Sequence, residues 1–137
     1  MNSVFDLAIP ANTTKASPVS ELHRLTHGII HRVEVSFPPG CAGLAHVVIL
    51  RGLHQLWPTN PEGSFHSDSY TSQWNDYHRL FAEPFAVVLK GWNLDDTYPH
   101  TITVRLALLE REVLEPETRE VGFMRRLGQV LFGPPGR

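Results

Sequence analysis

Histidine is the residue type in this chain best suited to metal binding or proton transfer, and eight histidines occur among its 137 residues. Three of them, His23, His27 and His31, recur every four residues, a spacing that would align three imidazoles as zinc ligands on one face of a helix. Gly28 and the alternation of apolar and polar residues from Ile29 onward favour a strand instead. No CxxC or HExxH motif accompanies them, so we predict no metal site and interpret the histidines as half-exposed sheet and loop residues.

Few other residues in the chain are placed for catalysis. Cys41 lies in a Pro-Pro-Gly-Cys-Ala-Gly turn and, as a nucleophile, would need a histidine partner that no motif supplies. The serines lack a GxSxG elbow, and no glycine-rich phosphate loop occurs. Asn93, Asp95 and Asp96 carry oxygens suited to calcium, but the spaced ligands of an EF-hand are absent and this composition is typical of a hairpin turn. We therefore predict that the protein is not an enzyme and has no cofactor.

Three tryptophans form the remaining candidate site. Trp57, Trp74 and Trp92 fall in or near expected loops, where exposed indole faces would stack on a sugar and Asn60 would hydrogen bond to it. A carbohydrate-binding module is therefore the alternative to a structural role. The competing interpretation, that the indoles cover the ends of the core, is favoured because Trp57 lies at a strand end and Trp92 continues the alternation of its strand.

The segments that must position these side chains alternate like β-strands. Between Leu25 and Phe37 the residues Ile29, Val33 and Val35 are apolar at odd positions, whereas the even positions from 32 to 36 are polar. This period of two is typical of a half-buried strand. The run from residue 44 to 56 carries aliphatic and β-branched residues on both faces, as a central strand covered on both sides does.

The later segments complete the predicted sheets. Residues 85–90 and 101–109 both alternate, and we expect them to form an antiparallel pair. Residues 64–77 fit either a short helical turn or an irregular edge strand, between which the sequence does not decide. Short strands, turn-rich connections and the lack of long intervening helices favour an all-β fold, an antiparallel β-sandwich or small jelly roll.

The two ends of the chain differ from this core. We predict an N-terminal arm with a short strand over residues 1–21, a sandwich core over residues 22–111, and a linker with an amphipathic helix over residues 112–137. The arm has little apolar content, and a helix of about three turns is marginal in water, so both ends are expected to need a neighbouring surface. The residues predicted to contact neighbouring subunits are Val4, Phe5, Leu7, Ile9, Phe123, Leu127, Val130 and Leu131.

The predicted helix, residues 121–132, has apolar residues that recur at threes and fours. Docking on the protein's own sandwich and docking on another subunit fit this pattern equally well. Its arginines are too few for a basic, membrane-binding face.

Composition limits the class of partner. The chain has 12 Lys and Arg against 14 Asp and Glu, a net charge of −2, so no general attraction to nucleic acid or anionic lipid is expected. A single cysteine excludes an internal disulfide. The N-terminus lacks the pattern of a classical secretion signal, and no apolar run is long enough for a membrane span. A cytoplasmic location is therefore expected, and the resemblance described next adds a virion as the alternative.

Three stretches carry a family resemblance: FPPGCAGLAHVVI, LWPTNPEG and GWNLDDTYPHTITVRLAL. In this order, and within a chain this short, they resemble small β-sandwich proteins of phage and other virus particles, in which single jelly rolls with terminal arms serve as capsid, decoration or tail components. The resemblance covers about Val33 to Leu109. It implies a non-catalytic virion subunit that forms homo-oligomers or joins other subunits of a large assembly, and it carries over no site residues.

Overall fold

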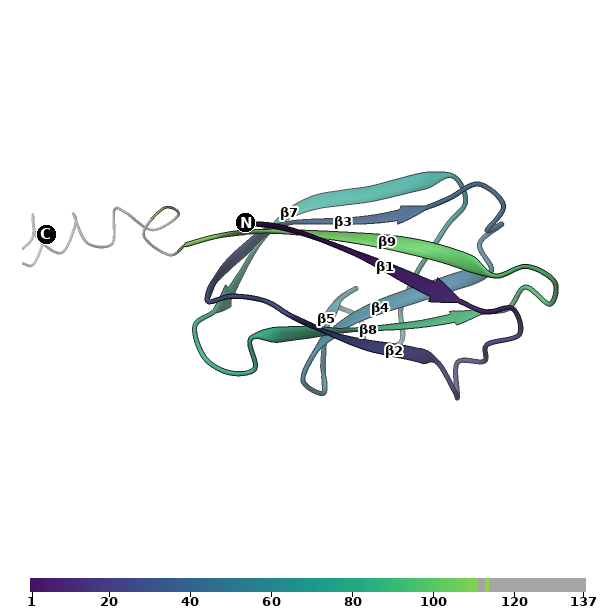
Figure 1. Ribbon diagram of the computed structural model, residues 1–137, viewed down its shortest axis with the longest axis horizontal. Coiled ribbons are helices and arrows are strands. Elements are labelled where there is room, and N and C mark those ends of the chain that lie inside the picture. Colours follow the sequence, from purple (N-terminus) through teal and green to yellow (C-terminus); the bar gives the residue numbers. More distant parts are fainter. Residues whose placement is uncertain (111–112, 114–137) are drawn as a thin grey trace, which may run out of the picture.

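The computed structural model describes residues 1–110 and Val113, which form a sandwich of two antiparallel sheets (Figure 1). The predicted all-β fold is confirmed. The predicted C-terminal helix, with Phe123, Leu127, Val130 and Leu131, lies outside the described residues. The strands are β1 (Asn2–Ile9), β2 (Val19–Arg24), β3 (Gly28–Phe37), β4 (Ala45–Arg51), β5 (His54–Trp57), β6 (Phe65–His66), β7 (Tyr70–Leu80), β8 (Ala86–Asn93) and β9 (His100–Leu109).

Eight of these strands follow the path of one long hairpin rolled into two layers. β1 pairs with β9, β2 with β8, β3 with β7, and β4 with β5, all antiparallel. Further pairing of β3 with β9 and of β4 with β8 gives the orders β1-β9-β3-β7 and β2-β8-β4-β5, here called the β1 sheet and the β2 sheet, and β6 pairs with β4. This is the strand arrangement of a jelly roll.

The core forms where the inner faces of the two sheets meet. In β9 the side chains of Ile102 and Val104 point inward and are fully buried. Thr101 and Thr103 alternate with them and point outward. β3 contributes Val33 and Val35 in the same way. Each such side chain stabilises the fold by roughly 1.5–3 kcal/mol through its removal from water.

β1 belongs to this core, which corrects the prediction of a free N-terminal arm. Leu7 and Ile9 are fully buried and pack over Gly91 of β8. A Cβ added at Gly91 would lie 2.5 Å from Ile9 Cδ1 and 2.8 Å from Leu7 Cδ2, so the absence of a side chain there makes room for β1. The sandwich therefore begins at Asn2 and not at residue 22, and Leu7 and Ile9 make contacts within the chain and not with a neighbour.

Two other strand predictions need correction. Residues 85–90 and 101–109 belong to β8 and β9, which do not pair, because the connection between them crosses from one sheet to the other. The run from 44 to 56 is not one strand: Gly52, with φ +62°, turns the chain into the hairpin of β4 and β5. The undecided segment 64–77 forms β6 and most of the edge strand β7. None of the described residues forms a helix long and apolar enough to cross a bilayer.

Candidate interaction surfaces

The outer face of the β1 sheet is a polar surface whose side chains bind one another. The guanidinium of Arg32 on β3 donates to Gln73 Oε1 at 2.8 Å and to Asn75 Oδ1 at 3.2 Å, both on β7. At the other side of the sheet, Thr103 Oγ1 donates to Asp6 Oδ1 at 2.8 Å. Because these groups already satisfy each other, the face gains little from a further polar partner.

A hollow of about 420 Å³ lies on this face next to β1. Arg105 at its side is held loosely: its Nη1 lies 3.9 Å from Glu34 Oε2 and 3.4 Å from Ser36 Oγ, and 49% of its side chain is exposed. The residues that line the hollow are Asn2, Val4, Arg32, Glu34, Arg105, Leu106 and Ala107.

The outer face of the β2 sheet carries apolar residues flanked by polar ones, Ser20 and Lys90 on one side and Arg24 on the other. Leu22 of β2 lies directly opposite Val88 of β8, which lies opposite Leu50 of β4, so the three form one continuous line across three strands. We call these residues the apolar row. Leu22 is 61% exposed, and Val88 and Leu50 are half-buried. Leu53, in the turn that follows β4, is fully exposed.

β1 is the edge strand of its sheet, and its backbone groups alternate in direction. Leu108 N donates to Met1 O at 2.7 Å, and the Met1 ammonium donates to Leu108 O at 2.6 Å, so these two residues form a hydrogen-bonded pair. In an antiparallel ladder the next residue along then directs its N–H and C=O away from the partner strand. The residues of β1 whose backbone groups face the free edge are thus Asn2, Val4, Asp6 and Ala8, and their side chains are all exposed.

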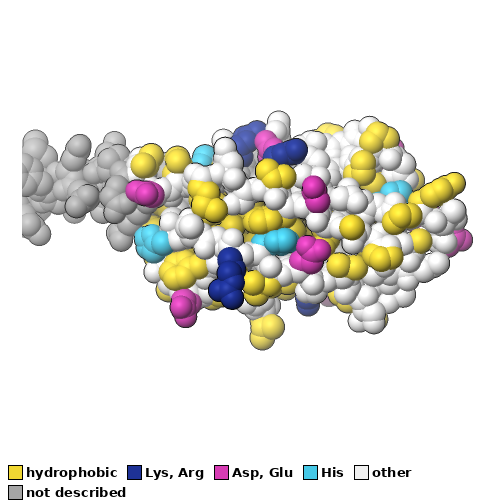
Figure 2. All heavy atoms as spheres, viewed as in Figure 1, with side chains coloured by type: hydrophobic (Ala, Val, Ile, Leu, Met, Phe, Trp, Pro, Cys, Tyr) yellow, Lys and Arg dark blue, Asp and Glu magenta, His cyan; other side chains and the backbone are white. Residues whose placement is uncertain are grey.

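The neighbouring edge, β2, is protected in a way that β1 is not. Glu21 and His23 of β2 point inward between the sheets, where His23 stacks on Phe5 with ring centroids 4.1 Å apart. His23 Nε2 lies 3.2 Å from Glu21 Oε1, but the alignment is too poor for a hydrogen bond. Inward-pointing charged residues discourage strand addition, because a second strand would enclose them. Figure 2 shows the side of the molecule that carries both edges, where hydrophobic, charged and histidine side chains are interspersed.

Trp57 and Trp74 come together at the opposite side of the sandwich, between β5 and β7. Their rings meet edge to face with centroids 6.3 Å apart, and both indole N–H groups point at Asp76 Oδ2, at 2.6 and 3.4 Å. His78 packs against Trp57 and lies 3.3 Å from Arg51, and burial followed by the Arg51 charge lowers its pKa. This cluster closes the core at its open side.

Trp92 lies elsewhere, on the outer face of the β2 sheet. It is covered by His46, whose ring stacks on it with centroids 5.1 Å apart, and by Lys15, whose Nζ lies 5.5 Å from the ring centroid. His46 Nδ1 is 2.8 Å from Ser64 Oγ. Burial lowers the pKa of His46, and the neighbouring His66 and Lys15 charges lower it further.

The structure thus does not assemble the predicted sugar site. Trp57 and Trp92 are at most 7% exposed and lie in separate clusters, so neither offers an open ring face for stacking, and that prediction is wrong for both. Trp74 is half-buried, and Asn60 is exposed in the loop after β5. Trp57 belongs to the core and Trp74 packs against it, whereas Trp92 lies outside the core, on the outer face of the β2 sheet.

Two aspartates that could attract a cation instead hold turns. Asp95 accepts hydrogen bonds from the Thr97 and Tyr98 amides and from His100 Nε2, and these bonds lower its pKa. Asp68 accepts from the Gly40 and Ala42 amides, which lower its pKa in the same way.

The turn held by Asp68 encloses Cys41. This thiol is fully buried, and burial, followed by the charges of Asp68 and Asp95, raises its pKa and disfavours the thiolate. Within residues 1–110, no three His, Cys, Asp or Glu side chains gather in a way that could hold a metal ion.

Of the residues predicted to contact neighbours, the structure leaves Val4 exposed and Phe5 half-buried. The apolar row was missed by the sequence analysis. Its signal was present in the run Val19–Arg24, where Leu22 alternates with the charged or titratable Glu21 and His23. Leu50 and Val88 fall in the runs 44–56 and 85–90, which the sequence predicted only as strands.

The comparisons with known proteins add no family. No protein-family model and no curated protein matches the sequence. Among solved structures, the chain is similar to a mitogen from Yersinia pseudotuberculosis, with 8% identity, a TM-score of 0.41, and coverage of 80% of this chain and 86% of that chain. It is also similar to a protein of Bacillus endospore appendages, described as disulfide-linked pili, with 9% identity, a TM-score of 0.33, and coverage of 80% and 88%. Both similarities are too weak to indicate a function.

Proposed function

We propose that the protein is a non-catalytic structural subunit that assembles with further copies of itself, in a virus particle or a similar large assembly. The observation that carries this proposal is the apolar row of Leu22, Val88 and Leu50, which lies on the outside of one sheet while the other sheet's outer face is polar. Apolar residues gathered on one side of a domain favour a partner that removes them from water. The jelly-roll arrangement is compatible with such a role by analogy, since capsid subunits use it, although lectins and cupins do too.

The C-terminal segment of a neighbouring copy is the occupant that we propose for the apolar row. Its apolar residues Phe123, Leu127, Val130 and Leu131 repeat with helical spacing, and a helix this short needs a surface. The chain leaves the described sandwich at Glu110, beside the start of β1 (Figure 1). Val113 N donates to Glu110 O at 3.0 Å, and the seven residues from 114 to 120 beyond this turn span up to about 25 Å when extended. Residues 111–120 carry four glutamates against two arginines, and this net negative charge favours an extended linker.

Two full-length variants test this proposal by complementation. Leu22→Glu with Val88→Thr disables the apolar row, and Leu127→Glu with Leu131→Glu disables the C-terminal segment. Each variant alone should show a lower mass than wild type by light scattering after size exclusion. An equimolar mixture should regain mass, because the intact row of one variant binds the intact segment of the other.

The matched control is Thr101→Glu, which introduces the same charge at an exposed site on the outer face of the β1 sheet and should leave assembly unchanged. Wild-type protein that is monomeric at all concentrations would refute self-assembly. Wild-type protein that assembles, with variants that each keep the full mass of the wild-type assembly, would refute the apolar row and the C-terminal segment as a contact.

A further inference from the structure

We infer that the free edge of β1 is a second self-association surface, at which β1 pairs with β1 of another copy about a two-fold axis. This inference deepens the proposed self-assembly and rests on it. The pairing would join two β1 sheets into one continuous sheet in the order β7-β3-β9-β1, followed by the partner subunit's strands in reverse. The apolar row lies on the outer face of the β2 sheet and not on the free edge of β1, so it stays available.

The free edge presents a regular set of unpaired donors and acceptors. The backbone groups of Asn2, Val4, Asp6 and Ala8 point away from β9, as the Met1–Leu108 pair fixes the alternation. Among the described residues no segment pairs with this edge, since β9 is the one strand neighbour of β1. The edge has no proline or lysine before Pro10, and its register with β9 is continuous over all eight residues. Apart from the single charged side chain of Asp6, it therefore lacks the features that usually block strand addition.

The remaining edges are less suited to such pairing. β2 points Glu21 and His23 inward, and β5 has only four residues before Pro58. The register of β7 against β3 shifts between Ile30 and Arg32, which interrupts the regular alternation of its backbone groups. β1 is thus the edge best able to receive another strand.

One register uses the whole edge. A two-fold axis that passes Phe5 places Val4 opposite the partner subunit's Asp6 and Asn2 opposite the partner subunit's Ala8, so that all outward-facing backbone groups find partners. A two-fold axis at Asp6 would instead set Asp6 opposite the partner subunit's Asp6, where like charges repel. A two-fold axis at Val4 would leave Ala8 unpaired.

Charge complementarity supports the same register. Arg105 of β9 lies directly opposite Val4, so the partner subunit's Asp6 would lie two strands from Arg105, roughly 10 Å between Cα atoms. An extended arginine and an aspartate can bridge this span, and the hollow between Arg105 and Val4 leaves the guanidinium room to turn toward the edge. Its present contacts at 3.4 and 3.9 Å are weak enough to be exchanged.

Amide hydrogen exchange on the full-length protein tests the pairing residue by residue. At low concentration the amides of Val4, Asp6 and Ala8 should exchange rapidly, while those of Phe5 and Leu7, bonded to β9, should exchange slowly. At concentrations where light scattering shows assembly, the three even-numbered amides should slow by about tenfold or more, and the two odd-numbered amides should be slow throughout.

A second pair of variants separates the edge from the fold. Val4→Pro removes one outward N–H donor without removing a hydrogen bond to β9. The two-fold axis places this donor in the contact twice, so the substitution should lower the affinity of the edge contact by about tenfold or more. Val4→Thr, the matched control, keeps the donor and should change the association by less than about threefold. Circular dichroism and cooperative thermal unfolding of both variants should match wild type.

Three results would overturn the inference. The first is rapid exchange of the even-numbered amides in protein that is demonstrably assembled, which would leave the apolar-row contact standing and remove the edge contact. The second is protection of these amides in the monomer, which would mean that a segment of the same chain covers the edge. The third is association of a folded Val4→Pro variant as tight as that of wild type.

Discussion

Replacement of Gly91 by alanine tests whether β1 is held inside its own sandwich. The new Cβ would lie 2.5 Å from Ile9 Cδ1 and 2.8 Å from Leu7 Cδ2, each about 1 Å shorter than an ordinary carbon contact. Both side chains are fully buried, so neither can move into solvent. Overpacking of this kind costs roughly 1–3 kcal/mol. On an unobstructed strand the same change would be stabilising, because alanine loses less backbone entropy on folding than glycine does.

A double-mutant cycle identifies the cause of the loss. Ile9→Val removes the Cδ1 atom and alone should cost about 0.5–1.5 kcal/mol. In the Gly91→Ala background it should cost less, because it relieves the closest overlap, and we expect a coupling of about 1 kcal/mol. Urea unfolding of the four proteins, followed by tryptophan fluorescence, gives the free energies of unfolding. A Gly91→Ala variant as stable as wild type, or a strictly additive cycle, would show that β1 does not pack over β8 as described.

Two further predictions concern the aromatic clusters. Asp76→Ala should destabilise the protein by about 1–3 kcal/mol, because it leaves the buried Trp57 N–H without its acceptor. In the Asp76→Ala background, Trp57→Phe should lower the free energy of unfolding by less than it does in wild type. Equal losses in the two backgrounds would contradict the role of Asp76. The lowered pKa of His46 means that the folded protein binds fewer protons than the unfolded chain, so stability should fall as the pH drops from about 7 to 5. His46→Asn should make this decline shallower in thermal unfolding at a series of pH values, and a slope identical to that of wild type would exclude His46 as a contributor.

The sequence was sufficient for the fold class because strand alternation is a local property. In Val33 to Phe37 each inward residue is apolar by itself, and the observed burial follows the pattern residue by residue. Pairing is not local, which is why the strand from Val4 to Ile9 was assigned to a neighbour and the strands β8 and β9 to each other. The room left by Gly91 for β1, which decides the first case, is not visible in either segment alone.

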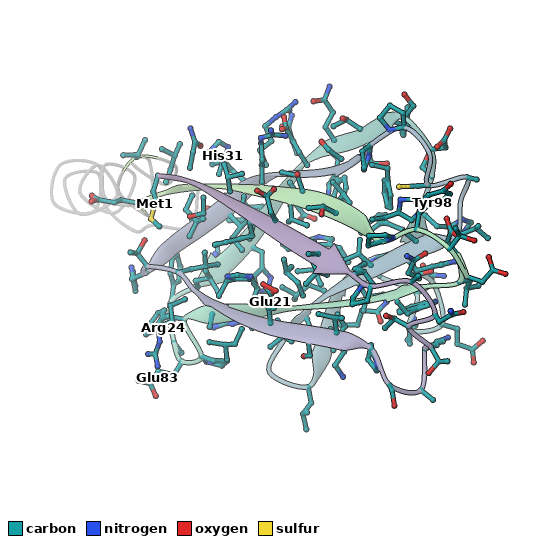
Figure 3. The ribbon with its side chains drawn as sticks, turned by 45° about the vertical axis from the view of Figure 1, so that its right-hand side comes forward. Met1, Glu21, Arg24, His31, Glu83 and Tyr98 are labelled. Atoms are coloured by element: carbon teal, nitrogen blue, oxygen red, sulfur yellow. The ribbon has the colours of Figure 1, made fainter. Side chains whose placement is uncertain are left out.

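The candidate surfaces were harder to predict for a similar reason. Leu22, Val88 and Leu50 are distant in sequence and become neighbours only through the registers of β2 and β4 with β8. The tryptophans illustrate the opposite error, because residue type suggested ring faces open to a ligand whereas tertiary contacts cover Trp57 and Trp92. What an aromatic side chain can bind depends on which of its faces the rest of the chain leaves open; Tyr98, labelled in Figure 3, is 65% exposed, in contrast to Trp57 and Trp92.

The difference between the two outer faces makes each molecule directional. In a layer whose copies all turn the β2 side the same way, the hydroxyl- and guanidinium-bearing sides would form the opposite surface, so the layer would have chemically distinct front and back surfaces. Sidedness of this kind would be encoded in the tertiary structure of a single chain, and it would require no second protein to tell inside from outside.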